Sequence, residues 1–185
     1  MKKTEIKPMF DFLLYATKLK KIPRSGWVKK VGVKNPESVA GHTFGLALCC
    51  MLFSDVRGLN TEKVLKMALL HDLIELKIGD LMPKEKLKLG VELKEKEEKA
   101  MIEILSRLPE KLRKEYHDLW IEFKDQETRE AKLVNDLDLI EMGIQALDYE
   151  REGYPKGKLD EFWETIENSI SEEYLFKILK QMRGG

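Results

Sequence analysis

Apolar residues recur at helical spacing along almost the whole chain, and this pattern limits the fold more than any other feature. In segments 39–55 and 62–77, apolar side chains follow one another every three or four residues, as on the buried face of an α-helix. No stretch alternates apolar and polar residues in the way that marks a half-buried strand. A chain of 185 residues can bury one sizeable core. The sequence therefore predicts an all-α protein, a compact bundle of about seven to eight helices in a single domain over residues 1–185.

Helix-capping and helix-breaking residues place the ends of these elements. Pro23 ends the first helix, because the residue before a proline is pushed out of the helical region. Ser38 is a suitable N-cap for the second helix, and Asn60 or Thr61 for the third. The expected helices cover residues 9–21, 39–55, 62–77, 92–108, 109–125, 128–152, 159–170 and 172–182, with loops at 22–37 and 78–90. We expect residues 10–155 to form the core and the helices within 156–183 to pack on it.

The charge balance and the cysteines argue against several classes of protein. Lys and Arg together number 33, as do Asp and Glu, so no global field would attract a nucleic acid polymer or an anionic membrane. No segment approaches the roughly 18 uninterrupted apolar residues of a membrane span. Cys49 and Cys50 are neighbours on an expected helix and point about 100° apart, which argues against a disulfide between them. We therefore expect a soluble cytoplasmic protein with no nucleic acid polymer and no membrane as partner.

The segment HDLIELKIGD, residues 71–80, places ionisable side chains in or just after a helix that is apolar on almost every side. An ionised carboxylate buried there costs several kcal/mol unless it is paired or bound to a metal. His71 and Asp72 lie about 100° apart, close enough to reach one ion, and Glu75 follows one turn later on the same side. One helix could thus supply two metal ligands and an acid or base. A lone His-Asp pair is uninformative, however, because a buried histidine with salt-bridged neighbours is the commoner structure.

A second His-Asp pair serves as an internal control. His117 and Asp118 lie in KEYHDLWIEF, which is typical of a charged amphipathic helix, and surface exposure explains both side chains. We assign that pair no role in a site.

Two further helices carry polar side chains in apolar surroundings. His42 lies in VAGHTFGLALCC, where an imidazole needs a hydrogen-bond partner. In NDLDLIEMGIQALDYE, Asp136 and Asp138 are two residues apart, so at most one of them should point inward. Two histidines and two aspartates from three helices could together surround one divalent cation, with positions left open for water and a substrate oxygen. Mixed imidazole and carboxylate ligands suit Mn²⁺, Co²⁺, Ni²⁺, Fe²⁺ or Zn²⁺ better than Ca²⁺.

Positive charge is concentrated just before the second expected helix. Residues 12–36 contain no acidic residue but several lysines and Arg24. Favourable charge at a helix C-terminus and solvation of a loop explain most of the lysines. Arg24 differs, because its planar guanidinium beside Gly26 and Trp27 could grip a phosphate while the indole offers a flat surface to a base or sugar.

Together these segments resemble the HD-domain metal-dependent phosphohydrolases, a family named for its His-Asp pair. The resemblance lies in the order of His42, His71-Asp72 and Asp138 on successive helices. Within the family, the chain is similar to the 5'-deoxynucleotidase group through the motifs RSGW, PESVAGHTFGLAL, MALLHDLIELKIGD and LVNDLDLIEMGIQALDYE, which span about residues 10–155. Each motif alone is weak, whereas the ordered set is specific.

The resemblance implies a compact helical HD domain, usually a homodimer, that hydrolyses deoxyribonucleoside 5'-monophosphates to deoxynucleoside and phosphate with one divalent metal ion, Mg²⁺ included among the candidates. By resemblance, the metal ligands are His42, His71, Asp72 and Asp138, the catalytic acids are Glu75 and Asp80, and the substrate contacts are Arg24 and Trp27. The family thus selects Asp138 over Asp136. Two alternatives stay open: an HD hydrolase of nucleoside triphosphates or nucleotide analogues of the oxetanocin-pathway type, and a non-catalytic nucleotide-binding module.

Overall fold

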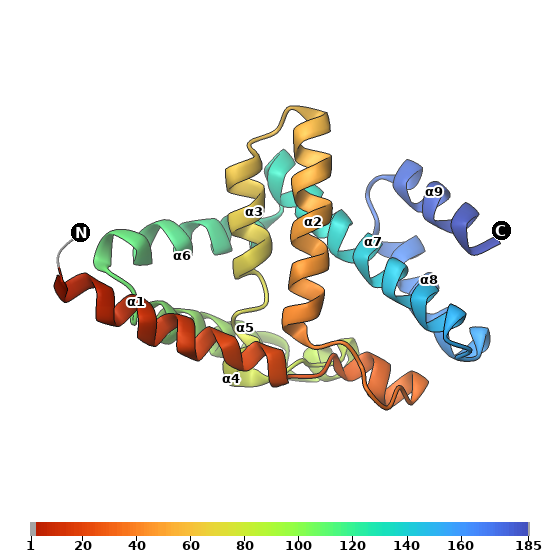
Figure 1. Ribbon diagram of the computed structural model, residues 1–185, viewed down its shortest axis with the longest axis horizontal. Coiled ribbons are helices and arrows are strands. Elements are labelled where there is room, and N and C mark those ends of the chain that lie inside the picture. The colour runs from red at the N-terminus through yellow and green to blue at the C-terminus, as the bar shows by residue number, and fades with distance from the viewer. Residues whose placement is uncertain (1–2, 185) are drawn as a thin grey trace.

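The protein is built from helices alone, as the sequence predicts (Figure 1). The computed structural model describes residues 3–184, in which no strand occurs and only an isolated bridge joins Pro23 to Ser38. The elements are α1 (Lys3–Ala16), the 3₁₀ segment η1 (Thr17–Lys21), the π-helical turn η2 (Trp27–Val31), α2 (Val39–Arg57), α3 (Thr61–Leu70), α4 (Glu75–Ile78), α5 (Pro83–Leu105), α6 (Glu110–Asp125), α7 (Arg129–Arg151), α8 (Lys156–Ser169) and α9 (Glu173–Gly184).

Side-chain caps begin the helices that hold the centre of the fold. The Ser38 hydroxyl accepts a hydrogen bond from the Gly41 amide at 3.1 Å, and the Asn60 side chain accepts one from the Lys63 amide, also at 3.1 Å. Each cap satisfies an amide that has no partner inside its helix. Both capping predictions are confirmed.

The predicted helix over residues 62–77 is wrong in one respect, because it divides into α3 and α4 at His71. Between them the backbone changes to i to i+3 bonding, with the Leu73 amide donating to the Leu70 carbonyl and the Glu75 amide to the Asp72 carbonyl, both at 3.1 Å. A 3₁₀ turn rotates successive side chains further than an α-turn does. The change of helix type therefore falls at the His-Asp pair and alters the directions in which the pair points.

The predicted loop over residues 78–90 is also largely wrong, since α5 begins at Pro83. Proline is favoured at the first helical position, where its missing N–H costs nothing. The Glu85 carboxylate accepts a hydrogen bond from the Met82 amide at 2.7 Å and strengthens this start. Gly90, with φ 49° and ψ −123°, kinks the helix at the position where the sequence predicts the loop to end.

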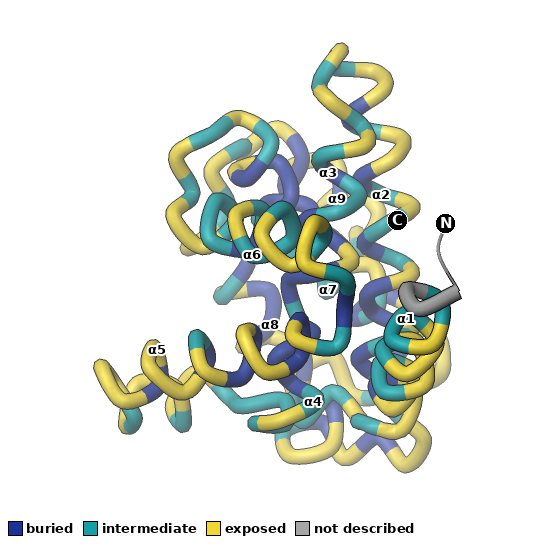
Figure 2. The backbone as a smooth tube through the Cα atoms, turned by 90° about the vertical axis from the view of Figure 1, so that its left-hand side faces the viewer, coloured by how far each residue is buried: buried dark blue, intermediate teal, exposed yellow. Residues whose placement is uncertain are grey.

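Two apolar clusters fill the interior, and α2 and α3 contribute to both. Figure 2 shows that the buried stretches of the chain gather in the middle of the molecule. The first lies among η2, α2, α3, α7, α8 and α9, and the second among η1, α5, α6 and the adjoining ends of α2 and α3. On α2, Val39 belongs to the second cluster and Leu46 to the first. His42 lies between these two positions, so the boundary between the clusters runs past the first candidate ligand.

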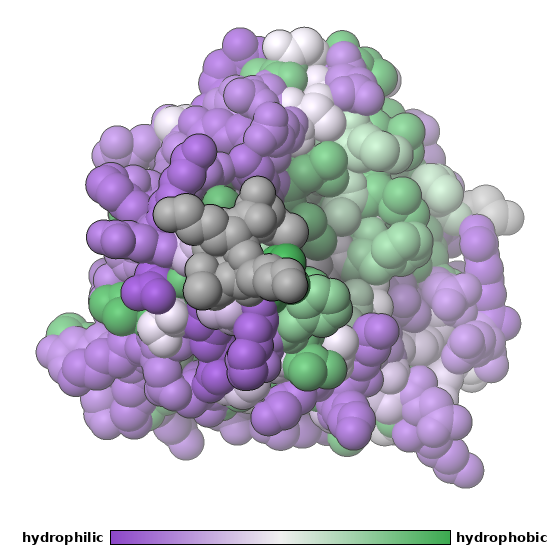
Figure 3. Space-filling model, turned by 60° about the vertical axis from the view of Figure 1, so that its left-hand side comes forward, coloured by the Kyte–Doolittle hydropathy of each residue, from purple (hydrophilic) through white to green (hydrophobic). Residues whose placement is uncertain are grey.

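Helix α2 has a buried side and an uncovered apolar side. By length and composition it is the one helix among residues 3–184 that could cross a membrane, a test that core helices also pass. It packs against α3 and α7, and its His42 and Leu46 are fully buried. The opposite side exposes Phe44, Leu48, Met51, Leu52 and Val56. Figure 3 shows a broad hydrophobic area on one face of the molecule.

Candidate active site

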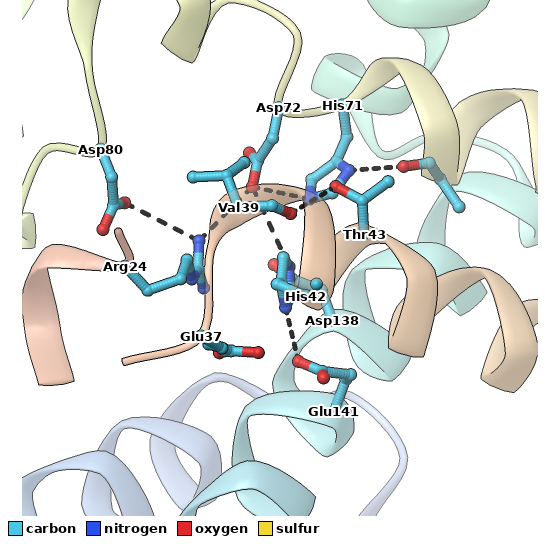
Figure 4. A network of polar contacts seen from close by, with 12 residues as sticks. Arg24, Glu37, Val39, His42, Thr43, His71, Asp72, Asp80, Asp138 and Glu141 are labelled. Carbon is cyan, nitrogen blue, oxygen red and sulfur yellow. Dashed lines mark hydrogen bonds and ion pairs between the residues drawn. The ribbon is translucent and has the colours of Figure 1, made fainter. Parts of the chain in front are cut away.

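His42 lies at the centre of a group of carboxylates, with an acidic partner at each ring nitrogen (Figure 4). The side chain is completely buried between α2 and α7. Its Nδ1 lies 2.5 Å from Oε2 of Glu141, and its Nε2 lies 2.9 Å from Oδ1 of Asp138. Helix α7 therefore contacts both edges of the imidazole.

His71 and Asp72 enter the same group from the turn between α3 and α4. His71 donates a hydrogen bond from Nδ1 to the Ala68 carbonyl at 2.7 Å, which turns its Nε2 away from the helix. That Nε2 lies 3.1 Å from Oδ2 of Asp72, and the same oxygen lies 3.9 Å from Nε2 of His42. The Nε2 atoms of both histidines thus converge on one carboxylate oxygen.

These atoms fit a divalent metal ion. One ligand atom from each of His42, His71 and Asp72 lies within 4.8 Å of the other two. Both Nε2 atoms are buried, and neither makes a hydrogen bond of good geometry to any residue in the range 3–184. A buried polar atom without a partner is costly, and a cation among the three would satisfy both nitrogens at once. Imidazole nitrogen with carboxylate oxygen is also a ligand set that transition metals accept.

The pKa shifts of His42 and Asp72 indicate that the space between these residues favours positive charge. Burial lowers the pKa of His42, and so does the nearby charge of Arg24. The neighbouring carboxylates of Asp138 and Glu141 outweigh both effects and raise that pKa to about 10. Burial opposes ionisation of Asp72, yet the positive charges of the adjacent histidines and of Arg24 hold its pKa well below the usual range.

Arg24 lies beside the group and is held there by acids. Its Nη1 lies 3.4 Å from Oδ2 of Asp72 and 3.7 Å from Oδ1 of Asp80. The other oxygen of Asp80 accepts a hydrogen bond from the Ser25 amide. Burial alone would lower the pKa of Arg24, but Asp72 and the other nearby carboxylates raise it above its ordinary value. Asp80 therefore anchors the segment that carries the guanidinium.

Glu75 differs from Asp80, because its carboxyl group is buried without an arginine or lysine partner among residues 3–184. The residue is 4% exposed, and its Oε2 makes no hydrogen bond to the described part of the chain. Burial raises the pKa of Glu75 most, and the negative charges of Asp72 and Asp80 add to the rise, to about 9. Such a group can hold a proton at neutral pH.

A cleft of about 180 Å³ opens beside Arg24, Asp72 and Asp138. Its other walls include Trp27 and Phe162, whose rings stack with centroids 4.2 Å apart and planes 22° apart. Trp27 is only 2% exposed, and its Nε1 donates a hydrogen bond to Glu37 at 2.8 Å, so most of the indole is covered. Phe162 belongs to α8, for which the sequence indicated only packing, and nothing in its apolar surroundings distinguishes it from a core residue.

Several charged residues considered in the sequence lie outside the site. Asp118 is exposed and pairs with Lys114 on its own helix at 2.5 Å, as expected, whereas His117 is half-buried and lies 2.7 Å from Glu98 of α5. Asp136 is 1% exposed and accepts hydrogen bonds from Ser171 and from the Glu172 amide near the start of α9.

The expectation that at most one of Asp136 and Asp138 points inward is wrong. Asp138 faces His42, whereas Asp136 faces the α8–α9 connection on a different side of α7. A helix buried on several sides offers more than one inward direction, and α7 is such a helix.

Comparison with known proteins identifies the family of this chain. Residues 16–178 match the model of the HD domain family. The 5'-deoxynucleotidase HDDC2 of Danio rerio is 38% identical over 94% of this chain and 86% of its own length. A conserved hypothetical protein from Pyrococcus furiosus is 38% identical, with a TM-score of 0.76 over 95% of this chain and 99% of its own. The protein belongs to the HD domain family.

A more distant structure shares the fold. The cyanophage S-2L HD phosphohydrolase DatZ, bound to dA and one catalytic Zn²⁺ ion, is 19% identical, with a TM-score of 0.54 over 92% of this chain and 93% of its own.

Proposed function

We propose that the protein is a metal-dependent 5'-deoxynucleotidase that releases phosphate from deoxyribonucleoside 5'-monophosphates. The observation that carries the proposal is the convergence of His42, His71 and Asp72 on one point, with Arg24 beside it and a cleft in front. The HDDC2 enzymes from zebrafish and human, 38% and 35% identical to this chain, supply the substrate class. The structure with dA and Zn²⁺ shows that the same fold can hold a nucleoside and a metal in another protein.

His42, His71, Asp72 and Asp138 would hold one divalent ion. Such an ion supplies Lewis-acid chemistry, which offsets charge on a phosphoryl oxygen and lowers the pKa of a water molecule. Asp138 would be the fourth ligand, because its carboxylate already lies against Nε2 of His42. Zn²⁺, Mn²⁺ and Co²⁺ are the first ions to test, because mixed nitrogen and oxygen ligands suit them.

Arg24 would bind the phosphate of the substrate. Its guanidinium lines the cleft and keeps its charge, and a planar fork of donors matches two phosphate oxygens. Asp80, which the family resemblance places among the catalytic acids, would also hold that fork in place through its contacts with Arg24 and the Ser25 amide. Phosphate contacts of this kind are stronger where water is excluded, and the Arg24 side chain is only 18% exposed.

Glu75 would transfer the proton that the departing 5'-oxygen of the substrate needs. Its buried Oε2 has no partner among the described residues, so it is free to hydrogen-bond a water molecule or the 5'-oxygen of the substrate. Hydrolysis consumes one water, places its oxygen on phosphorus and returns one proton to the departing 5'-oxygen. Glu75, which can hold a proton at neutral pH, would give that proton to the departing 5'-oxygen and would regain one from the attacking water.

We also propose that two copies associate through the uncovered face of α2. The stripe formed by Phe44, Leu48, Met51, Leu52 and Val56 carries no charge of its own, and monomeric proteins rarely expose a large continuous apolar area. A two-fold axis through Leu48 would bring the same uncharged face of a second copy against it. Light scattering should give the mass of a dimer for the wild type and of a monomer for Leu48→Glu/Leu52→Glu. A wild type that stays monomeric at micromolar concentration contradicts this arrangement.

The function is tested by phosphate release from a panel of nucleotides. The panel holds ribo- and deoxyribonucleoside monophosphates and triphosphates, each assayed after chelation and after adding back Mn²⁺, Co²⁺, Zn²⁺ or Mg²⁺. We expect turnover of deoxyribonucleoside monophosphates that chelation removes and one of the metals restores. Turnover confined to triphosphates would identify the other HD chemistry. Full metal occupancy without any turnover would identify a nucleotide-binding module.

A further inference from the structure

We infer that Glu141 is a positioning residue, whose hydrogen bond with Nδ1 of His42 fixes the imidazole so that Nε2 faces Asp72 and Asp138. The inference rests on the proposed metal site and assigns a role to a residue that would not itself touch the ion. Glu141 is 6% exposed, and its Oε2 lies 2.5 Å from the ring nitrogen. In a metal-bound histidine, the partner of the second nitrogen sets both the tautomer and the direction of the ring.

Helix α7 supplies the two contacts from adjacent turns. Asp138 and Glu141 are three residues apart, so both lie on the side of α7 that faces α2. One lies at Nε2 of His42 and the other at Nδ1. Helix α7 therefore contacts both nitrogens of the ring, and a flip of the imidazole would break both contacts.

Gly45 makes room for the Glu141 carboxylate on the facing helix. A Cβ atom at this position would lie 2.6 Å from Oε1 of Glu141, closer than real Cβ atoms come to another atom, and 3.1 Å from its Cγ, which is tighter than most Cβ contacts. Gly45 follows His42 by about one turn of α2, so the missing side chain leaves space for the Glu141 carboxylate directly beside the histidine. Gly41, one turn earlier, has no such contact, because its Cβ would come no closer than 3.6 Å to Ser38.

The two histidines are held by acceptors of different kinds. Nδ1 of His71 donates to the neutral Ala68 carbonyl within its own helix, whereas Nδ1 of His42 donates to a carboxylate from another helix. A carboxylate makes the ring a stronger donor to a metal than a carbonyl does. Removing the Glu141 carboxylate should therefore weaken metal binding by His42, beyond any effect of altered packing between α2 and α7.

A competing arrangement uses the other nitrogen. One ligand atom each of Glu37, His42 and Glu141 also lies within 4.8 Å of the other two. Glu37, however, already accepts a hydrogen bond from Trp27 Nε1 at 2.8 Å. In that arrangement Nδ1 of His42 would bind the ion, and Glu141 would be a ligand rather than a positioning residue.

The experiment compares metal binding by Glu141→Ala, Glu141→Gln and Gly45→Ala with that of the wild type. Competition with a chromophoric chelator gives the affinity for Co²⁺ and Zn²⁺, and ¹⁵N NMR of the Zn²⁺ form reports which His42 nitrogen carries the metal. Glu97→Gln and Gly41→Ala serve as matched controls, because Glu97 is equally buried but pairs with Lys124, remote from the site. Thermal unfolding monitored by circular dichroism shows whether each variant is folded.

We expect Glu141→Ala to weaken metal binding by about 10- to 100-fold. Glu141→Gln should weaken it less, because the amide oxygen still accepts from Nδ1–H. Gly45→Ala should act in the same direction as Glu141→Ala, and both controls should match the wild type. The NMR spectrum should show the metal on Nε2 and the proton on Nδ1.

Three results would overturn the inference. They are an unchanged affinity in folded Glu141→Ala, an equal loss in Glu97→Gln, and the metal on Nδ1 of His42. If the wild type itself binds no metal, the proposed function fails first, so the two failures are distinguishable.

Discussion

The chain contains the same dipeptide twice, and the two copies lie in opposite environments. The side chains of His71 and Asp72 are 3% and 15% exposed, whereas that of Asp118 is 58% exposed and that of His117 is 28% exposed. The first pair lies where α3 changes to a 3₁₀ turn, and its polar atoms converge with those of His42. In the second pair, Asp118 contacts Lys114 on the surface of its own helix, and His117 contacts only Glu98 of α5 among the charged residues described.

The difference shows that the surroundings of a His-Asp pair, and not the dipeptide itself, determine whether the pair can form a metal site. Both pairs have a histidine that could bind a metal. Only the first has a second histidine from another helix, an arginine at its edge and a buried acid one turn further along. A water-exposed carboxylate gains little from one more partner, while a buried one must be neutralised. Substitutions in the two regions should therefore differ greatly in effect.

The largest effect is expected for Asp72→Ala. It removes the oxygen on which both histidine nitrogens converge and leaves Arg24 without its nearer carboxylate. Metal should be lost, and kcat/KM should fall by about 10³-fold or more, which corresponds to about 4 kcal/mol of transition-state stabilisation. Metal content after dialysis, measured by atomic emission, is the check. A variant that keeps one equivalent of metal would contradict the ligand assignment.

A smaller effect is expected for Glu75→Gln, which should keep the metal but lose proton transfer. General acid-base catalysis contributes about 10²-fold or more to a rate, so kcat should fall by that amount with little change in metal affinity. Stopped assays of phosphate release give kcat, and the same chelator competition gives the affinity. Glu98→Gln, which changes the acid beside His117, is the matched control and should behave as the wild type. Equal turnover by Glu75→Gln and the wild type would remove Glu75 from the mechanism.

Arg24→Ala should have a moderate effect that falls mainly on KM. Hydrogen bonds to a charged phosphate contribute about 2 kcal/mol, so kcat/KM should fall about 30-fold. Arg24→Lys should recover only part of this loss, because an ammonium group lacks the planar fork. Lys29→Ala tests whether general positive charge explains the result, since Lys29 lies in the same basic segment but pairs with Glu85 on the surface. If Lys29→Ala raises KM as much as Arg24→Ala, the phosphate contact is not specific.

Much of the fold follows from local sequence rules. The helical period of the apolar residues predicted the all-α class, and the caps at Ser38 and Asn60 marked two helix starts. The errors at α4 and α5 have a common cause. Tertiary packing determines both the change from α to 3₁₀ bonding at His71 and the helix start at Pro83. The periodicity of apolar residues carries no information about that packing.

The ligand group was easier to foresee than its surroundings. His42 and the His71-Asp72 pair stood out because a charged or polar side chain in an apolar helix needs a reason. Glu141 was visible three residues after Asp138, but without the third dimension its partner at His42 Nδ1 could not be named. Phe162 gave no signal, since an aromatic residue on an amphipathic helix looks the same whether it faces the core or the cleft.

The smallest effect is expected for the second His-Asp pair itself, and this is the strictest test of the comparison. Asp118→Ala removes one i, i+4 contact with Lys114 on an exposed helix face, worth less than about 0.5 kcal/mol of unfolding free energy. Metal affinity and kcat/KM should stay within about twofold of the wild type, because no polar atom of this pair reaches the cleft. Urea unfolding, metal competition and phosphate release measured on this one variant would show the result. A loss of metal here comparable to that of Asp72→Ala would mean that burial and convergence do not distinguish the two pairs, and the assignment of the site would have to change.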